Sequence, residues 1–594
     1  MGRSVRSPLA FMMREAHAAS AEAAARGMPI DEVTGVRAER SRARKAMVRE
    51  ALEEYNDSVR RANERGAPQD HQARRDHLAN LRAASRGVSR RDVLRGAGTA
   101  VAGGLVLGTA GILRPQRAAA GGQPRIVVVG GGLAGLRCAH KLWTKSGWTS
   151  TVYEANASVG GRVETNRGYF ANGQIVEMHG EFISSEHASA LALASSFGLG
   201  LDDTLAYPAG TSDTYWFNGT RYTQAQLNAD WQSFGYQAFH NAVKTVPWPQ
   251  SYNRHSSTGA TWDSMTVPQW LSANLPGGLS TEFGRLCLES VIPEYGGDPS
   301  DQSALNVTMM LGYNDSTGGR GYQSPTSPVL AGTDERWHIT GGNDQLVTNM
   351  VRQLPAGTIQ TGQVLIAVKN NGNGTFTCTF QSGLATHQVT CDHLVFACPF
   401  KTLRNVDLSQ AGLSALKMTA IDNLGMGSNG KILMQFNGRP WVTDGYTANL
   451  LSDTTAESTW EANYQANNYT APTSLLVDYP GGSNTLNILS KYGITAHEGV
   501  PPGSLVTATL AALEPAFPGL TTAYNGLAWY HFGNNDPYVQ GAYSYWRVGQ
   551  YTSFSGYEGV AEGHAHFCGE HTTQNFQGYM EGAISSGERV AGEV

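Results

Sequence analysis

Gly130, Gly132 and Gly135 form a GxGxxG motif, which could bind the pyrophosphate of a dinucleotide through backbone N–H groups. Gly130 permits a tight turn, Gly132 lets the backbone approach the phosphates, and Gly135 lets a helix pack closely on a strand. Glu154 stands about twenty residues further on, where an acidic side chain can accept hydrogen bonds from the adenosine ribose. These residues therefore predict nucleotide binding.

The residues around the motif predict the elements that must position it. Residues 125–129 (RIVVV) have the β-branched, apolar character of a buried parallel strand, and a helix is expected from the glycines to about Trp143. Residues 151–153 (TVY) predict a second strand that ends at Glu154. The N-terminus of the intervening helix offers free N–H groups and a positive dipole end to the phosphates. A glycine-rich turn without function is therefore a remote alternative.

The segment after Glu154 favours FAD over NAD. Residues 159–165 (VGGRVET) include Gly160, Gly161 and Arg162, and they resemble the GGR-x-x-T segment of flavin-dependent amine oxidases. In that family the glycines and the arginine run beside the pyrophosphate and the flavin of FAD. An arginine suits this place because its guanidinium is a fixed cationic fork.

The most specific resemblance lies near the C-terminal end. Residues 567–572 (FCGEHT) and 578–583 (GYMEGA) resemble the FAGEHT…GYMEGA signature of monoamine-oxidase-type enzymes. The resemblance implies that Glu570 holds the ribityl chain and that the amides opening a helix at Met580 face the pyrimidine edge of the flavin. The predicted cofactor-binding residues are Gly130, Gly132, Leu133, Ala134, Gly135, Glu154, Ala155, Gly160, Gly161, Arg162, Val364, Gly569, Glu570, Tyr579 and Met580.

Three residues imply the reaction. Tyr543 and Tyr579 would form the aromatic cage of the family, which flanks the substrate amine, and Lys431 would be the lysine that binds a water near N5 of the flavin. Taken singly, each has an ordinary alternative, an aromatic core residue or an exposed lysine on a strand, but their joint placement favours catalysis. Ala542 stands where some members carry a cysteine bonded to the flavin, so noncovalent FAD is expected.

The resemblance implies an FAD-dependent amine oxidase. In such an enzyme the C–N carbon of a neutral amine gives hydride to flavin N5, and the imine is hydrolysed to an aldehyde and ammonia. The reduced flavin then passes its electrons to O₂, giving H₂O₂. An aromatic, desolvated site favours the neutral amine, and most of the chemistry belongs to the cofactor.

The substrate is narrowed by Phe182, which stands where L-amino-acid oxidases of the snake-venom type carry a carboxylate-binding arginine. This favours an amine without an α-carboxylate. An L-amino-acid oxidase, giving a 2-oxo acid, stays open because Arg320 or Arg336 could supply the charge. Glu181 could hold a second amino group of a diamine or be a structural acid, and we favour the structural role. A flavin C–C desaturase is a weaker alternative, and so is a flavin-binding protein without turnover.

Charge argues against a nucleic-acid partner. From Gly121 onward the chain has 22 Lys and Arg against 36 Asp and Glu, a formal charge of −14, whereas phosphate contacts need clustered basic residues. The six cysteines form no CxxC pair and no cluster with zinc-like spacing, so no metal site is expected, and disulfide pairing stays open.

The segment 89–120 resembles a twin-arginine export signal. Arg90 and Arg91 precede a Gly/Ala-rich run and a small-residue site at residues 118–120, although Val93 stands where the pattern usually has Phe. The resemblance implies export by the twin-arginine translocase to the periplasm or the medium. Residues 1–88 predict a charged helical extension, which could be a propeptide, a regulatory arm or an unused upstream start.

The expected fold class is α/β, with a Rossmann-like FAD-binding domain built from discontinuous segments and an α+β substrate-binding domain. The expected partners are a small amine or amino acid and O₂, and a homodimer stays open. The FAD-binding domain is assigned to residues 121–200, 333–430 and 540–594, and the substrate-binding domain to residues 201–332 and 431–539.

Overall fold

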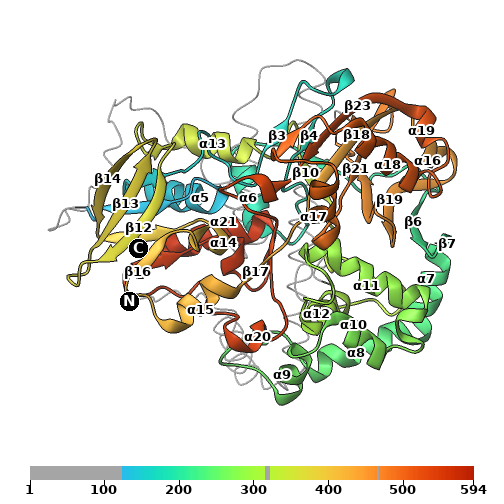
Figure 1. Cartoon of the computed structure of the whole chain (residues 1–594), viewed down its shortest axis with the longest axis horizontal. Helices are drawn as coiled ribbons and strands as arrows, with labels where there is room; N and C mark the ends of the chain where they lie inside the picture. Colours follow the sequence, from blue (N-terminus) through green and yellow to red (C-terminus); the bar gives the residue numbers. More distant parts are fainter. Residues whose placement is uncertain (1–122, 315–320, 465–466) are drawn as a thin grey trace, which may run out of the picture. The chain divides into compact units, whose positions relative to one another are not determined.

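The computed structural model describes residues 123–314, 321–464 and 467–594 (Figure 1). The predicted helical extension at 1–88 and the predicted twin-arginine segment at 89–120 lie outside the described residues. No helix in the described ranges is both long enough and apolar enough to cross a membrane.

A parallel five-stranded sheet carries the glycine motif. The central strand β1 has four buried residues, as the run of β-branched side chains predicts, and it pairs in parallel with β2 and β15. The strand order β11-β2-β1-β15-β25 confirms the expected α/β class. The strands are β1 (Ile126–Val129), β2 (Thr151–Tyr153), β11 (Ile359–Gln360), β15 (His393–Phe396) and β25 (Ala565–Phe567).

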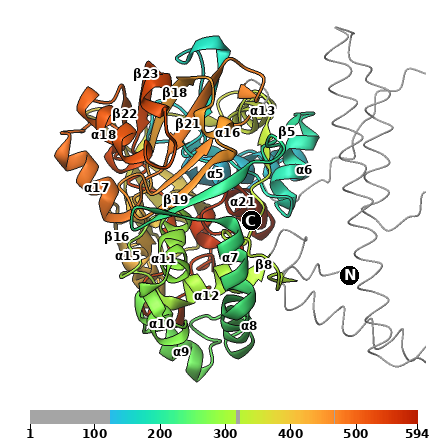
Figure 2. The same ribbon diagram turned by 90° about the vertical axis from the view of Figure 1, so that its right-hand side faces the viewer.

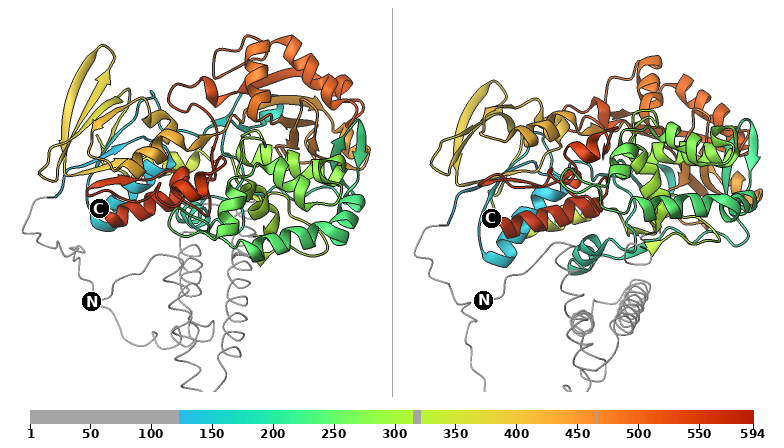
Figure 3. Two further views of the ribbon diagram at one scale, coloured as in Figure 1. Left: turned by 60° about the horizontal axis from the view of Figure 1, so that its bottom comes forward. Right: turned by 90° about the horizontal axis from the view of Figure 1, so that it is seen from below.

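Helix α5 (Leu133–Lys141) starts directly after the glycines and packs against α21 (Met580–Glu593). The two helices lie side by side, α5 in blue and α21 in red (Figure 3). Their approach is close, because a Cβ atom on Gly587 would lie 2.3 Å from the carbonyl oxygen of Ala134. The first and last helices of the described chain therefore form one layer on the parallel sheet.

An eight-stranded mixed sheet forms the core of the second half of the fold, in the order β22-β23-β18-β21-β20-β19-β6-β7. Its strands come from residues 212–222 and 431–531. In Figure 2, helices α8 to α12 gather at the bottom of the view, and strands of this sheet lie above them. The strands are β6 (Ser212–Phe217), β7 (Thr220–Tyr222), β18 (Lys431–Asn437), β19 (Tyr446–Ser452), β20 (Ser458–Glu461), β21 (Thr473–Asp478), β22 (Glu498–Gly499) and β23 (Tyr524–His531).

A smaller four-stranded sheet, ordered β14-β13-β12-β16, projects beside the parallel sheet at the left of Figure 1. Its strand β12 begins at Val364, one of the predicted cofactor-binding residues. The strands are β12 (Val364–Asn370), β13 (Phe376–Ser382), β14 (Ala385–Cys391) and β16 (Asp407–Gln410).

Two short strand pairs link parts of the chain that are far apart in sequence. β5 (Leu201–Asp203) pairs with β10 (Trp337–Ile339), and β17 (Gly425–Met426) pairs with β24 (Ser544–Tyr545). The other main helices are α6 (Ala188–Ser196), α7 (Gln224–Asp230), α8 (Tyr236–Thr245), α9 (Ser257–Asp263), α10 (Val267–Asn274), α11 (Glu282–Tyr295), α12 (Ala304–Gly312), α13 (Gln345–Gln353), α15 (Ala415–Asn423), α17 (Gly482–Lys491) and α18 (Gly503–Leu513). All six cysteines, which lie in the described ranges, are free thiols.

Candidate active site

One cavity of about 600 Å³ runs from the glycine motif to the predicted aromatic cage. Every predicted site residue except Gly135 lines it. Gly135 does not line the cavity and packs against the backbone of the glycine loop. A Cβ atom on Gly135 would lie 2.0 Å from the carbonyl oxygen of Gly130, so no side chain fits there. The lining residues from the prediction are Gly130, Gly132, Leu133, Ala134, Glu154, Ala155, Gly160, Gly161, Arg162, Glu181, Phe182, Val364, Lys431, Tyr543, Gly569, Glu570, Tyr579 and Met580.

The glycine loop leaves room for a phosphate group. Gly130 has a φ of 109°, and its Cβ would lie 2.9 Å from the carbonyl carbon of Ala397, so a side chain is excluded there. A Cβ on Gly132 would meet no atom closer than 3.9 Å and would project into the cavity. The N-termini of α5 and α21 both reach this cavity through Leu133 and Met580. The positive dipole end of α5 and the bare backbone of the glycine loop therefore fit a pyrophosphate, while α21 begins at Met580, where the resemblance expects the pyrimidine edge of the flavin.

Glu154, at the end of β2, is held in place by the backbone. Its Oε2 accepts from the N–H of Gly131 at 2.6 Å, and its Oε1 accepts from the N–H of Asn156 at 2.7 Å. Burial raises the pKa of Glu154, and backbone hydrogen bonds from Asn156, Gly131 and Ala155 act against that rise. A carboxylate has about four lone-pair positions, so Glu154 keeps acceptor capacity for a ribose hydroxyl.

Arg162 and Glu570 join the GGR segment to the C-terminal signature. Nη1 of Arg162 lies 2.9 Å from Oε1 of Glu570, and Oε2 of Glu570 accepts from Ser544 Oγ and from the N–H of Gly578. Burial alone would raise the pKa of Glu570, but the charge of Arg162 and the hydrogen bonds lower it overall. Glu570 is thus an ionised residue with several protein partners, a role that its expected contact with the ribityl chain did not include.

Tyr543 and Tyr579 line the substrate end of the cavity, and both hydroxyls are anchored. The hydroxyl of Tyr579 donates to Glu294, at 3.0 Å from Oε1. The hydroxyl of Tyr543 donates to the carbonyl oxygen of Pro293 and accepts from Nδ2 of Asn429 at 3.1 Å. Anchored hydroxyls restrict the rings, as a cage that orients a substrate requires.

Two carboxyl groups near the cage were not predicted as site residues. Glu294, on α11, and Glu335 both line the cavity, and no ion pair joins either of them to a cation within the described ranges. Burial, followed by neighbouring carboxylates, raises the pKa of both, for Glu335 to about 7 and for Glu294 well above the usual value. Glu294 interrupts an apolar helical run, which is the sequence signal that could have drawn attention to it.

Arg336 has a partner outside the cavity. Its Nη2 lies 2.6 Å from Oδ2 of Asp203, and its guanidinium lies 4.7 Å from the centroid of the Trp337 ring. Arg336 is not among the residues that line the cavity, so the structure does not support it as a carboxylate-binding residue. The other candidate, Arg320, lies outside the described residues. Phe182 lines the cavity and packs edge-on against Trp460.

Lys431, at the start of β18, is only 2% exposed, so the alternative of an exposed lysine on a strand is wrong. Its Nζ lies 2.6 Å from Oε2 of Glu181 and 2.9 Å from the carbonyl oxygens of Glu177 and His179. Glu181 also accepts hydrogen bonds from Trp460 Nε1 and the Tyr464 hydroxyl. Glu181 is therefore fully engaged by the protein, as a structural acid would be.

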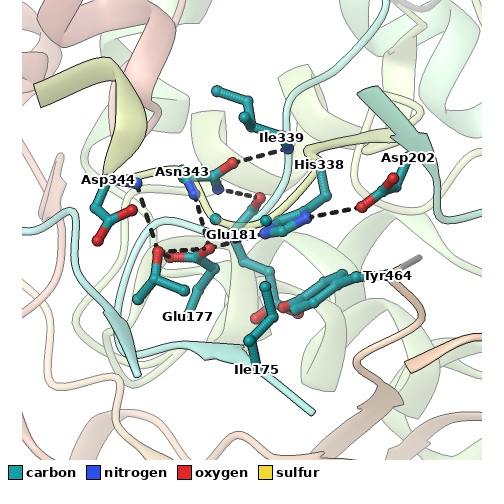
Figure 4. A network of polar contacts seen from close by, with 12 residues as sticks. Ile175, Glu177, Glu181, Asp202, His338, Ile339, Asn343, Asp344 and Tyr464 are labelled. Atoms are coloured by element: carbon teal, nitrogen blue, oxygen red, sulfur yellow. Dashed lines mark hydrogen bonds and ion pairs between the residues drawn. The ribbon is translucent and has the colours of Figure 1, made fainter. Parts of the chain in front are cut away.

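A buried polar network around His338 and Glu177 supports the backbone that binds Lys431 (Figure 4). His338 Nε2 lies 2.8 Å from Glu177 Oε1 and its Nδ1 lies 3.5 Å from Asp202 Oδ2. The His338 ring also stacks on Tyr464, with centroids 3.7 Å apart. Burial lowers the pKa of His338, but the two carboxylates outweigh it and raise the pKa to about 9. His338 is therefore cationic near neutral pH. No group of three or more His, Cys, Asp or Glu in the described residues could hold a metal ion.

Comparison with known proteins identifies the family. The model of the family described as flavin-containing amine oxidoreductase matches residues 133–594. A pseudooxynicotine dehydrogenase of a Pseudomonas species is 22% identical over 529 residues, covering 86% of this chain and 96% of the relative.

Two solved structures are similar in fold. Cyclohexylamine oxidase from Brevibacterium oxydans superposes with a TM-score of 0.64 at 21% identity, covering 80% of this chain and 98% of that one. A putrescine oxidase with bound putrescine superposes with a TM-score of 0.63 at 16% identity, covering 79% of this chain and 98% of that one. Because the family model spans most of the described chain, the protein belongs to the flavin-containing amine oxidoreductases and is an enzyme that oxidises amines with a flavin cofactor.

Proposed function

We propose that the protein is an oxidase with noncovalent FAD that acts on amines without an α-carboxylate. It would convert the amine to an imine, which water hydrolyses to an aldehyde and ammonia, and it would reduce O₂ to H₂O₂. The observation that carries the proposal is the pair of buried carboxyl groups at the substrate end of the cavity, where Glu294 and Glu335 lie beside Tyr579.

The cations of the cavity strengthen this argument. In the described ranges, the Arg and Lys side chains that line it are Arg162 and Lys431, and each is paired with a glutamate. Burial lowers the pKa of His179 well below its usual value and that of His531 to about 3, so both rings are neutral near pH 7. Among the described residues, an α-carboxylate would therefore find no unpaired cation in the cavity, and burying it there would be costly. An amine without an α-carboxylate avoids this cost of burial.

The residues of the site have separable tasks. When bound, the flavin accepts the hydride and then passes the electrons to O₂. Tyr543 and Tyr579 flank the amine and hold its C–N bond in one orientation. The enclosed aromatic cavity excludes water and favours the neutral amine, which is the form that can give up hydride.

A substrate with a second amino group is favoured by the two acids. Burial disfavours the ionised forms of Glu294 and Glu335, and the far ammonium group of a diamine would be the cation that favours them. The similarity in fold to a putrescine oxidase agrees with this extension, although it is a likeness in fold alone.

The most informative experiment is an anaerobic panel of monoamines, diamines and L-amino acids, with bleaching of the flavin as the signal. Bleaching by amines, and none by L-amino acids, is expected. Bleaching by L-amino acids would instead support the alternative of an L-amino-acid oxidase. If no amine bleached the flavin but a C–C substrate did, the desaturase alternative would hold.

Noncovalent FAD is supported by Ala542, which lines the cavity next to Tyr543 and has no sulfur to bond to the flavin. Acid precipitation of the yellow protein should release all flavin to the supernatant. Flavin that stays with the precipitate would refute this part of the proposal.

We also propose export by the twin-arginine translocase, from the motif at Arg90 and Arg91. Replacing both arginines by lysine should retain the protein in the cytoplasm, and unchanged export would count against the proposal. The homodimer that the sequence leaves open can be decided by sedimentation of the purified protein.

A further inference from the structure

The ammonium group of Lys431 has no donor left for water. Its three N–H bonds match three acceptors, the carbonyl oxygens of Glu177 and His179 and the carboxylate of Glu181. A lysine that binds a bridging water would need one of these donors. Any effect of Lys431 on the flavin must therefore come from its charge and position, and both depend on its neighbours.

Glu181 is the anionic partner of Lys431 and also the end of a chain of contacts from the cage. Glu181 is 5% exposed, and its carboxylate accepts from Trp460 Nε1 at 2.8 Å. The Trp460 ring packs edge-on against Tyr479 at 5.0 Å, and the hydroxyls of Tyr479 and Tyr543 lie 3.3 Å apart. Glu181 thus joins the substrate side of the cavity to Lys431.

The other titratable groups around Lys431 cannot replace Glu181. His531 lies opposite Lys431 on the neighbouring strand β23, and its pKa is lowered to about 3 by burial and by His497 and Lys431. The His179 ring, which contacts His531, is likewise neutral. The carboxylate of Glu177 faces His338 and meets Lys431 only through its backbone carbonyl.

We infer that Glu181 is a positioning residue, which holds the Nζ of Lys431 at the wall of the cavity through a buried ion pair, for the reaction of the reduced flavin with O₂. In that step the reduced flavin gives two electrons and two protons to O₂, which leaves as H₂O₂, while Lys431 is unchanged. A positive charge favours the transfer of negative charge onto O₂. The inference rests on the proposed function, since that proposal assigns O₂ as the acceptor.

The test uses Glu181→Gln, which keeps the shape and removes the charge. A buried lysine without an anionic partner loses its proton several pH units earlier than an exposed one. We expect wild-type flavin, reduced with dithionite, to be reoxidised by O₂ at a rate that hardly changes between pH 6 and pH 9. Glu181→Gln should be slower by about tenfold or more at pH 9 and should recover to within about threefold at pH 6.

Two further variants separate this role from a structural one. Tyr464→Phe removes an uncharged donor to the same carboxylate, so it should leave the pH profile flat. Glu181→Asp keeps the anion, so its reoxidation rate should also be independent of pH. This variant tests the inference even if Glu181→Gln retains little flavin. A defect that is equal at all pH values in Glu181→Gln, or a sloping profile in Glu181→Asp, would overturn the inference.

The midpoint potential of the bound flavin gives a readout independent of turnover. At pH 6 the potential of Glu181→Gln should lie above that of wild type, because the positive charge of Lys431 is no longer balanced. The difference should become smaller as the pH rises, because a buried lysine without an anionic partner loses its proton more easily. Lys431→Met should lie below wild type at both pH values, and a pH-independent shift in Glu181→Gln would count against the inference.

A failure of the proposed function would give a different result from a failure of the inference about Glu181. If no amine bleached the flavin, or if O₂ did not reoxidise wild-type flavin, the proposed oxidase activity would be wrong. The potentials of Glu181→Gln and wild type would still test the pairing with Lys431.

Discussion

The guanidinium of Arg162 lies 2.9 Å from the carboxylate of Glu570, across 408 positions of sequence. Glu570 is buried and Arg162 is mostly so, which makes the pair different from the surface pair of Arg125 and Asp392. The pair joins the GGR segment to the C-terminal signature. This part of the cavity wall is therefore complete only when both segments are in place.

Breaking this pair should cost the enzyme its flavin. Arg162→Met leaves Glu570 charged and buried, which typically costs about 3–5 kcal/mol. We expect a lower ratio of flavin to protein absorbance and a lower melting temperature, both partly restored by added FAD. Asp392→Asn is the matched control, because an exposed ion pair in water contributes little to stability. Equal flavin content in the two variants would contradict the role of the pair.

Tyr579 should act through its ring more than through its hydroxyl. Tyr579→Phe loses the bond to Glu294 but keeps the aromatic face, so anaerobic bleaching by an amine should slow only slightly. Tyr579→Ala removes the face and should slow bleaching by about ten- to a hundredfold, as loss of orientation does. An unchanged rate in Tyr579→Ala would exclude the cage.

Glu335 should make the binding of a diamine depend on pH. Its pKa is raised to about 7, so its carboxylate becomes ionised, and able to bind an ammonium group, as the pH rises through 7. The KM for a diamine should therefore fall over this interval more than the KM for a monoamine of equal length. Glu335→Gln should weaken the binding of the diamine by roughly tenfold or more. In this variant the KM values of the diamine and the monoamine should change with pH to the same extent. Equal effects on the diamine and the monoamine would show that Glu335 does not bind the second amino group.

His338 should make the fold less stable in alkaline solution. Its folded pKa of about 9 lies above the ordinary value of 6.5, so its contribution is complete below about pH 6.5 and is lost as the pH rises through 9. The contribution is at most about 3 kcal/mol. The free energies of unfolding of wild type and His338→Gln, measured in urea at several pH values, should converge between pH 7 and pH 9.5. A constant gap would mean that His338 does not change its charge in this range.

The local part of the fold could be predicted from the sequence. The strands at residues 126–129 and 151–153 and the helix after the glycines are confirmed, because their signals are apolar runs and glycines within one βαβ unit. The helix was expected to reach about Trp143, but α5 ends at Lys141, and a wider turn at Leu142–Ser146 continues it. Helix ends depend on packing, which periodicity does not describe.

The electrostatic partners could not be predicted in the same way. Lys431 and Glu181 are 250 residues apart, and Tyr579 and Glu294 are 285 apart. No periodic pattern relates such residues, since they meet only after two sheets and the helices between them have assembled. The sequence therefore indicated which side chains could react but not which charges would balance them.

The parallel sheet places its edge strand β25 and the adjoining helix α21 at residues 565–593, although β1 is made from residues 126–129. On the ribosome, the glycine loop is thus synthesised long before the helix that completes its pocket. The cofactor can be captured tightly only after residues 565–593 have been made. Nascent chains that stall or are cut short before residue 565 should therefore be colourless, and flavin content becomes a measure of synthesis past this segment.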